Sequence, residues 1–62
     1  MKFAQLRKSK NLTQSQLAEK LGISNRTISM WETGCSTPKL KTVIRLAELL
    51  QSSKEEVLEC FN

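Results

Sequence analysis

Apolar residues recur three and four positions apart along most of the chain, which is the spacing that places side chains on one face of an α-helix. The chain has one proline, Pro38, and two glycines, Gly22 and Gly34, so few residues interrupt helical segments. No segment shows the apolar and polar alternation typical of a half-buried strand. The pattern therefore predicts an all-α fold.

The first predicted helix covers residues 2–10. Phe3 and Leu6 lie on its short apolar stripe, with Arg7 at the edge, and its other face is basic. We expect this helix to stop near Asn11.

The second predicted helix, residues 14–21, has strong start and stop signals. Thr13 is a suitable N-cap, and Gln16 stands three residues later as the partner in a capping box. Both positions of the hydrophobic staple are leucine. Gly22 suits the left-handed conformation that ends a helix.

The third predicted helix, residues 25–32, begins after the N-cap Ser24 and ends at Gly34. Ile28 and Trp31 share one side, which favours a core position for Trp31 over stacking on nucleic-acid bases. The opposite, polar side carries Asn25, Arg26, Ser29, Met30 and Thr33.

Two further helices complete the chain. One begins near Lys39, and its apolar residues at core spacing are Leu40, Val43, Ile44, Ala47 and Leu50. Ser53 and Glu56 form a second capping box that opens a short last helix, to which Val57 and Phe61 contribute apolar side chains. We therefore expect one compact domain of five short helices over residues 1–62.

Length and charge narrow the classes of function. A chain of 62 residues that is 39% hydrophobic supports one small core and excludes multi-domain enzymes. The net charge is +4, and residues 1–41 hold eight of the ten Lys and Arg but only two of the six Glu. This asymmetry indicates a polyanionic partner for the first two-thirds of the chain.

The residues needed for most enzyme chemistry are missing. The chain has no His, no Asp and no Tyr, which argues against an enzyme and a small-molecule substrate. Cys35 and Cys60 are 25 positions apart with no ligand pattern around them, so we expect no metal and no cofactor. A disulfide between them, or a redox role for Cys35, is the less favoured alternative to two passive thiols. Without a run of about 20 apolar residues, we expect no membrane segment and a cytoplasmic location.

The second and third helices, joined by a three-residue turn that contains Gly22, form a predicted helix-turn-helix. The runs LRKSKNLTQSQLAEKLGIS, TISMWETG and LAELL, with a proline between the last two, occur in the order and spacing of the XRE-type helix-turn-helix family, which includes phage repressors and Cro proteins. The chain resembles that family over nearly its whole length. It departs from the family at Lys39, where a Ser or Asn-type cap is usual, and at Gln51-Ser52, where Gly-Val is usual. The resemblance implies a lambda-repressor-like domain that binds double-stranded DNA.

The polar side of the third helix is the expected base-reading surface. An α-helix fits the major groove, and side chains near its N-terminus reach base edges. Asn25 can pair with adenine and Arg26 with guanine, while Ser29 can bond a base and Met30 can contact a thymine methyl. The alternative is a solvated polar face.

A second set of residues is expected to contact phosphates. At the start of the second helix, the amide of Gln14 and free backbone N–H groups can approach one phosphate together. The resemblance also places the loop after the third helix on the DNA backbone. The expected phosphate contacts are Gln14, Ser24, Thr33 and Lys39. For Lys8 and Lys10 we favour a solvated basic face.

The resemblance further implies an internal salt bridge. In the family, an Arg on the first helix pairs with a Glu at the end of the third, and these positions are Arg7 and Glu32 here. The pair would hold the recognition helix against the first helix.

The favoured function is a sequence-specific transcriptional regulator, a repressor of phage or mobile-element type. The alternative is a protein-interaction module such as the antitoxin of a toxin-antitoxin pair. Because one reading helix makes few base contacts, we expect a homodimer on a pseudo-palindromic operator. Leu49, Leu58 and Phe61 are candidates for the dimer contact, with core positions for some of them as the alternative.

Overall fold

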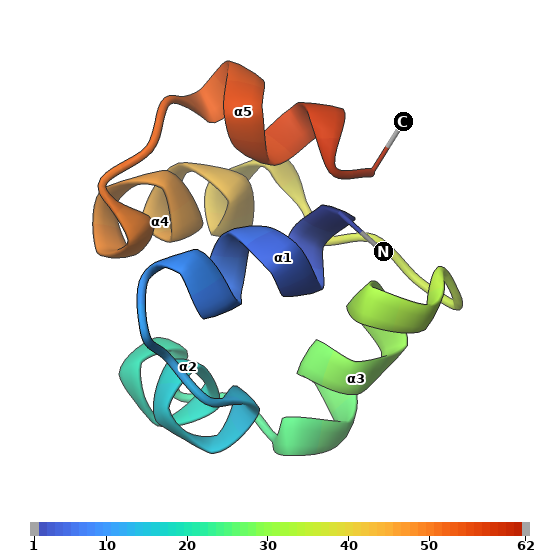
Figure 1. Ribbon diagram of the computed structural model, residues 1–62. Coiled ribbons are helices and arrows are strands. Elements are labelled where there is room, and N and C mark those ends of the chain that lie inside the picture. The colour runs from blue at the N-terminus through green and yellow to red at the C-terminus, as the bar shows by residue number, and fades with distance from the viewer. Residues whose placement is uncertain (1, 62) are drawn as a thin grey trace.

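The computed structural model describes residues 2–61, and all regular structure in that range is helical. In chain order the helices are α1 (Lys2–Ser9), α2 (Gln14–Leu21), α3 (Asn25–Thr33), α4 (Leu40–Leu50) and α5 (Lys54–Glu59). Helix α1 runs between the α2–α3 pair and the α4–α5 pair (Figure 1). The predicted all-α, five-helix fold is confirmed.

The start of α2 has the capping box predicted from sequence. The hydroxyl of Thr13 accepts a hydrogen bond from the Gln16 backbone N–H at 3.0 Å, and the Gln16 side chain accepts one from the Thr13 N–H at 2.9 Å. Gly22 ends the helix with φ +72°. The bounds of α2 are those predicted, because these signals act within a few residues of each boundary.

Two helices end on left-handed residues that are not glycine. Asn11 (φ +60°) follows α1, and Gln51 (φ +53°) is the C-cap of α4. Asn tolerates this conformation, whereas Gln pays a steric penalty from its Cβ. Gln51 is the position where the XRE-type pattern has Gly, so this departure from the family places a residue with a side chain in a left-handed conformation.

One core joins all five helices. Phe3 from α1 is fully buried. The centroid of its ring lies 6.0 Å from that of Trp31, in an edge-to-face arrangement, and 5.3 Å from that of Phe61. Trp31 is 5% exposed, which confirms its expected place in the core. The side chains with no exposed surface are Phe3, Leu17, Ile28, Leu46, Leu50 and Val57.

The apolar stripe of α4 differs from the prediction. Leu40 and Ile44 are 64% and 39% exposed, whereas Leu46, which the sequence analysis did not place in the core, is fully buried. The buried stripe is centred near Val43 and Leu50. Ile44 lies about 100° around the helix from Val43, on the side away from Leu46, which is why it falls outside the stripe.

The apolar residues proposed for a dimer contact differ in their burial. Leu49 and Phe61 pack against the core, so the core alternative is correct for these two residues. Leu58 is 43% exposed.

Both cysteines are free thiols, Cys35 exposed and Cys60 buried. None of the helices between residues 2 and 61 has the length and the apolar character that a membrane-spanning segment requires.

Candidate nucleic-acid interface

Helices α2 and α3 meet through a tight turn. The N–H of Ile23 donates to the Ala18 carbonyl at 3.0 Å, which closes the C-terminus of α2. Directly afterwards, the hydroxyl of Ser24 accepts from the Thr27 N–H at 3.3 Å and caps α3. Because one helix is closed and the next opened within three residues, the direction of α3 is fixed relative to α2.

The outward face of α3 is polar. Asn25, Arg26 and Thr33 are exposed, Met30 is 36% exposed, and Ser29 is half-buried. On the inward face, Ile28 and Trp31 hold the helix on the core. The structure therefore places the four predicted base-contacting residues on one side of α3.

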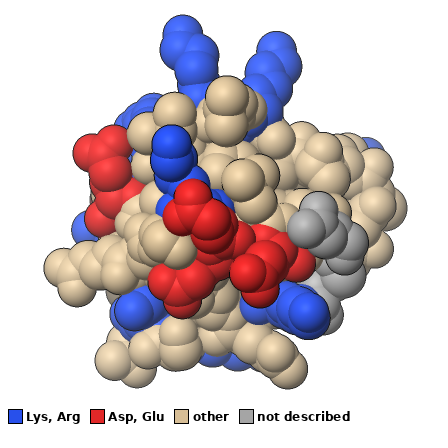
Figure 2. Space-filling model, turned by 90° about the horizontal axis from the view of Figure 1, so that it is seen from above, with Lys and Arg blue, Asp and Glu red and all other residues tan. Residues whose placement is uncertain are grey.

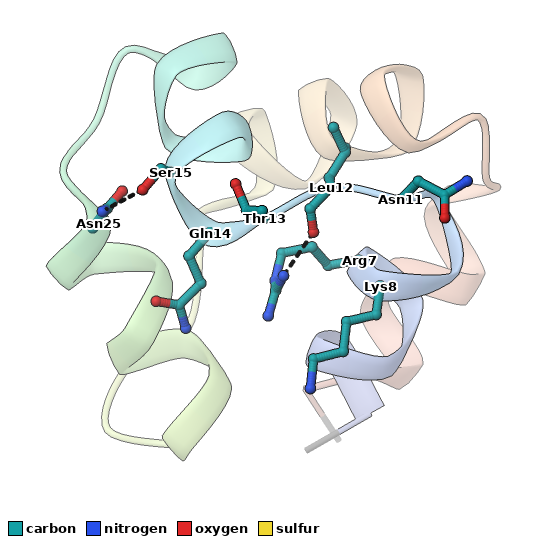
Figure 3. Close-up of a pocket in the computed structure, with 8 residues that line it drawn as sticks. All are labelled: Arg7, Lys8, Asn11, Leu12, Thr13, Gln14, Ser15 and Asn25. Carbon is teal, nitrogen blue, oxygen red and sulfur yellow. Dashed lines mark hydrogen bonds between the residues drawn. The ribbon is translucent and has the colours of Figure 1, made fainter.

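A hydrogen bond joins the first turns of α2 and α3. The amide nitrogen of Asn25 donates to the hydroxyl of Ser15 at 2.8 Å (Figure 3). Ser15 was not among the candidates from sequence, because its contact depends on how the two helices cross.

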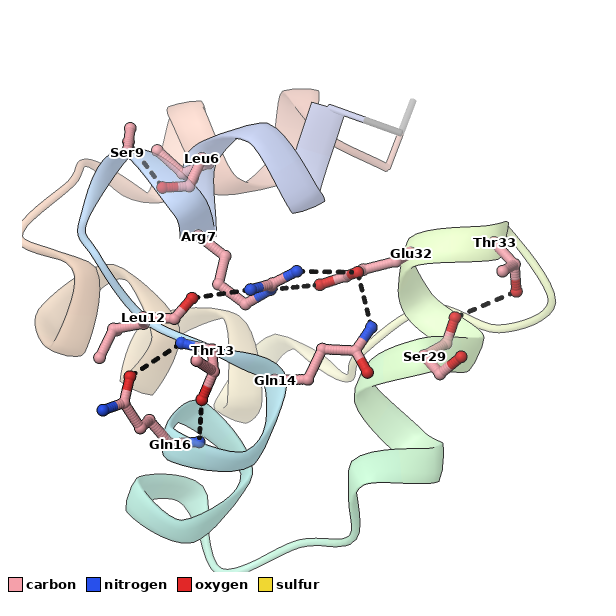
Figure 4. A network of polar contacts seen from close by, with 10 residues as sticks. All are labelled: Leu6, Arg7, Ser9, Leu12, Thr13, Gln14, Gln16, Ser29, Glu32 and Thr33. Carbon is pink, nitrogen blue, oxygen red and sulfur yellow. Dashed lines mark hydrogen bonds and ion pairs between the residues drawn. The ribbon is translucent and has the colours of Figure 1, made fainter.

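A buried polar network links α1 to α3. The guanidinium of Arg7 contacts Glu32 through Nε to Oε2 (2.6 Å) and Nη2 to Oε1 (3.3 Å) (Figure 4). Its Nη1 donates to the Leu12 carbonyl at 2.7 Å. The two side chains are 7% and 10% exposed. This is the Arg–Glu ion pair that the resemblance implied.

Gln14 belongs to the same network. Its amide nitrogen donates to Oε1 of Glu32 at 2.8 Å, which ties the first residue of α2 to the end of α3 (Figure 4). An amide nitrogen carries two N–H donors, so this bond leaves the second N–H and the amide oxygen for another partner. The expected phosphate contact is thus held in place from inside the protein.

The network keeps Glu32 ionised. Burial raises the pKa of Glu32, but the hydrogen bonds from Arg7 and Gln14 and the charges of Arg7 and Lys8 together outweigh burial and lower this pKa below its ordinary value of 4.5. The carboxylate therefore stays charged at neutral pH and accepts hydrogen bonds from both partners.

An open hollow of about 530 Å³ lies where α1, α2 and α3 meet (Figure 3). Its polar lining consists of Arg7, Lys8, Asn11, Gln14, Ser15 and Asn25, together with Thr13. The hollow brings a predicted phosphate contact, Gln14, and a predicted base contact, Asn25, to one surface. It also includes Lys8, to which sequence reasoning gave no specific role.

The remaining phosphate candidates lie elsewhere along α3. Ser24 stands at its start, where the hydroxyl serves as N-cap. Thr33 is at its last turn, and its hydroxyl donates back to the Ser29 carbonyl at 3.1 Å. Lys39 is exposed and precedes α4 without making a side-chain cap.

Acidic side chains cluster on the side of the molecule that carries α5. Three of the six glutamates, Glu55, Glu56 and Glu59, lie on α5, and acidic side chains gather on this side of the molecule (Figure 2). Helix α5 lies on the opposite side of α1 from α2 and α3 (Figure 1). The acidic side is therefore away from the outward face of α3.

Among residues 2–61, no group of three or more Cys, Asp, Glu or His side chains is placed to hold a metal ion.

The paired helices, the tight turn and the polar outward face of the second helix define a helix-turn-helix protein. A family model described as "Helix-turn-helix" matches residues 3–57, so the chain belongs to this family, and the XRE-type resemblance is confirmed.

Curated proteins similar to the chain are named as regulators. The chain is 40% identical over 57 residues to the HTH-type transcriptional activator BcrR of Enterococcus faecalis, an alignment covering 92% of the chain and 28% of that protein. It is 32% identical over 56 residues to the cryptic phage CTXphi transcriptional repressor RstR of Vibrio cholerae (90% and 50%). It is 40% identical over 47 residues to the uncharacterized HTH-type transcriptional regulator MJ0272 of Methanocaldococcus jannaschii (76% and 71%).

The chain spans half or less of the length of the first two of these regulators. No solved structure gives a significant match to the chain.

Proposed function

We propose that the chain is the sequence-specific, double-stranded-DNA-binding domain of a transcriptional regulator, with α3 in the major groove. The observation that carries this proposal is the first turn of α3, where Asn25 and Arg26 stand exposed beside each other at the helix-turn-helix. Side chains at this position of a recognition helix reach base edges. The proposed place of action is the cytoplasm, because a prokaryotic regulator that binds DNA meets its DNA there.

In this proposal each residue of the α3 surface has a role. Asn25 pairs with adenine and Arg26 with guanine, each discriminating by about 1–3 kcal/mol. One turn later, Ser29 bonds a base edge and Met30 packs on a thymine methyl group. The shape of the surface supports these roles, since all four side chains share one side of α3.

Phosphate contacts then fix the orientation of α3. Gln14 and Ser24 approach one stretch of backbone from the starts of α2 and α3, and Thr33 and Lys39 approach the backbone at the far end of α3. Such contacts carry no sequence information but set the register of the helix in the groove. For Thr33, the hydroxyl has to exchange its bond to the Ser29 carbonyl for one to a phosphate oxygen.

We propose repression as the outcome of binding, by occupation of an operator in phage or mobile-element DNA. The similarity to a protein named as a phage repressor supports this outcome, and the similarity to a protein named as an activator is the reason to test it. A reporter gene placed behind the operator should fall in expression when the regulator is present. A rise in expression would overturn repression while leaving DNA binding intact.

The proposed regulator binds its operator as a homodimer through α4 and α5. Among residues 2–61, three of the four exposed large apolar side chains, Leu40, Ile44 and Leu58, lie on these two helices. The Cα atoms of the domain extend over 23 × 23 × 21 Å, so two copies side by side span about 46 Å, which is enough to place their recognition helices the roughly 34–36 Å apart that half-sites one helical turn apart require.

Selection of bound sequences from a random DNA pool tests the DNA-binding proposal. We expect a pseudo-palindromic site, with Asn25→Ala and Arg26→Ala each relaxing base preference at one position per half-site. Gln14→Ala should weaken binding to all sequences about equally. Ser9→Ala, a change at an exposed position of α1, is the matched control. Unchanged base preference in both α3 variants would show that the assigned reading face is wrong.

Analytical ultracentrifugation, with and without operator DNA, tests the dimer. We expect two copies per operator for the wild type and a loss of the second copy in Ile44→Glu. Because Ile44 is 39% exposed, this variant should keep the fold. A single copy on the wild-type complex would refute the dimer.

A further inference from the structure

The hydrogen bond between Asn25 and Ser15 crosses the helix-turn-helix. It joins the first residue of α3 to the second residue of α2 over 2.8 Å, and both side chains are exposed at the edge of the hollow (Figure 3). A hydrogen bond between two exposed side chains adds little to folding stability, because water offers each group an equivalent partner. Its main effect is therefore on the orientation of the two side chains.

The chemistry of the carboxamide leaves the base-reading edge of Asn25 available. Its nitrogen carries two N–H donors and its oxygen accepts. The bond to Ser15 uses one N–H, so the second N–H and the oxygen remain. A bidentate contact to adenine requires this donor for N7 and this acceptor for the N6 amino group. Ser15 thus holds the side chain through one N–H of Asn25 and leaves the second N–H and the oxygen of the carboxamide for the base.

We propose that Ser15 is a specificity-determining positioning residue, which holds the carboxamide of Asn25 in the orientation that selects adenine. The proposal rests on the proposed function, since it requires α3 to read DNA. Arg26 provides a contrast, because its side chain makes no hydrogen bond with another residue of the described range 2–61. Ordering a side chain on binding weakens the contact by roughly three- to tenfold, and the bond to Ser15 reduces this loss for Asn25 alone.

The experiment measures base preference position by position. The operator is first selected with the wild-type protein, and the position read by Asn25 is identified as the one at which Asn25→Ala loses preference. The ratio of Kd for the changed base to Kd for the operator is then measured for wild type, Ser15→Ala and Ser15→Thr. Ser9→Ala serves as a serine control, because its hydroxyl bonds only the Leu6 carbonyl of its own helix.

We expect Ser15→Ala to lower the ratio measurably, by up to about tenfold, at the Asn25 position and to leave the Arg26 position unchanged. Ser15→Thr, which keeps a hydroxyl, should restore the ratio, and Ser15→Ala should add nothing to Asn25→Ala. A purely structural effect would instead lower affinity for all sequences together. The proposal is overturned if Ser15→Ala leaves the ratio unchanged or lowers it equally at every position. If the wild type selects no site, the proposed function fails and this inference fails with it; if only the Ser15 result is negative, the proposed function stands.

Discussion

Replacing Arg7 by alanine should remove a large part of the stability of the domain. Arg7 is 6% exposed, and its guanidinium serves two acceptors, the Glu32 carboxylate and the Leu12 carbonyl. The alanine variant leaves both acceptors without this donor. In particular, it leaves a charged side chain that is 10% exposed without its cation.

The expected loss follows from this geometry. Removing one partner of a buried ion pair costs about 3–5 kcal/mol. Glu32 keeps its hydrogen bond from Gln14, which favours the lower end, about 3 kcal/mol. A domain of this size has about 3–9 kcal/mol of stability in total. The melting temperature should therefore fall by at least about 12 °C.

Urea and thermal unfolding followed by circular dichroism measure this loss. Arg26→Ala is the matched control, because it removes the same side chain from an exposed position and should change stability by less than about 0.5 kcal/mol. Arg7→Lys should be intermediate, since a lysine keeps the charge but lacks the planar fork that reaches two acceptors. Equal stability of Arg7→Ala and Arg26→Ala would refute the reasoning.

Two further predictions concern stability. The difference in unfolding free energy between wild type and Glu32→Gln should be constant above pH 4.5 and shrink as the pH falls below it. The reason is that the pKa of Glu32 is lowered in the folded state, so the ionised carboxylate contributes fully above its ordinary pKa and loses this contribution once it is protonated in the folded state. Urea unfolding from about pH 7 to about pH 2 measures this difference, and a difference that does not depend on pH contradicts the prediction. Gln51→Gly should stabilise the domain by about 0.5–1 kcal/mol, because Gly adopts φ +53° without the Cβ penalty. Ser52→Gly, at the adjacent position with no positive φ, should destabilise it in the same thermal assay, and a lower melting temperature for Gln51→Gly would count against the strain.

Helix boundaries were predictable because their causes are local. The capping box of Thr13 and Gln16 and the stop at Gly22 involve residues within a few positions of each boundary. Where the signal was less specific, the error was one residue: α1 ends at Ser9 and α3 extends to Thr33.

The buried face of α4 was not predictable in the same way. Seven of its eleven residues are apolar, more than one face of a helix holds. Periodicity alone then allows several stripes, and packing against the neighbouring helices decides among them. The result is that Leu46 is buried while Leu40 and Ile44 are exposed.

The candidate site shows the same division between local and tertiary causes. The polar outward face of α3 follows from helical geometry and was visible in the sequence. The partners of these residues were not, because Ser15 meets Asn25 across 10 positions and Gln14 meets Glu32 across 18. Periodicity cannot pair residues on different helices, and the Arg7–Glu32 contact was expected only through the family resemblance.

The internal ion pair and the proposed phosphate contact form one hydrogen-bonded unit. Glu32 is held ionised by Arg7, and the ionised carboxylate accepts from the amide of Gln14 at the start of α2. Because the pair carries no net charge, it adds nothing to the counterion release that drives DNA binding. In the proposed DNA complex the pair acts through orientation instead: the Glu32 carboxylate fixes the direction of the Gln14 amide, whose free N–H is the group that we expect to contact phosphate.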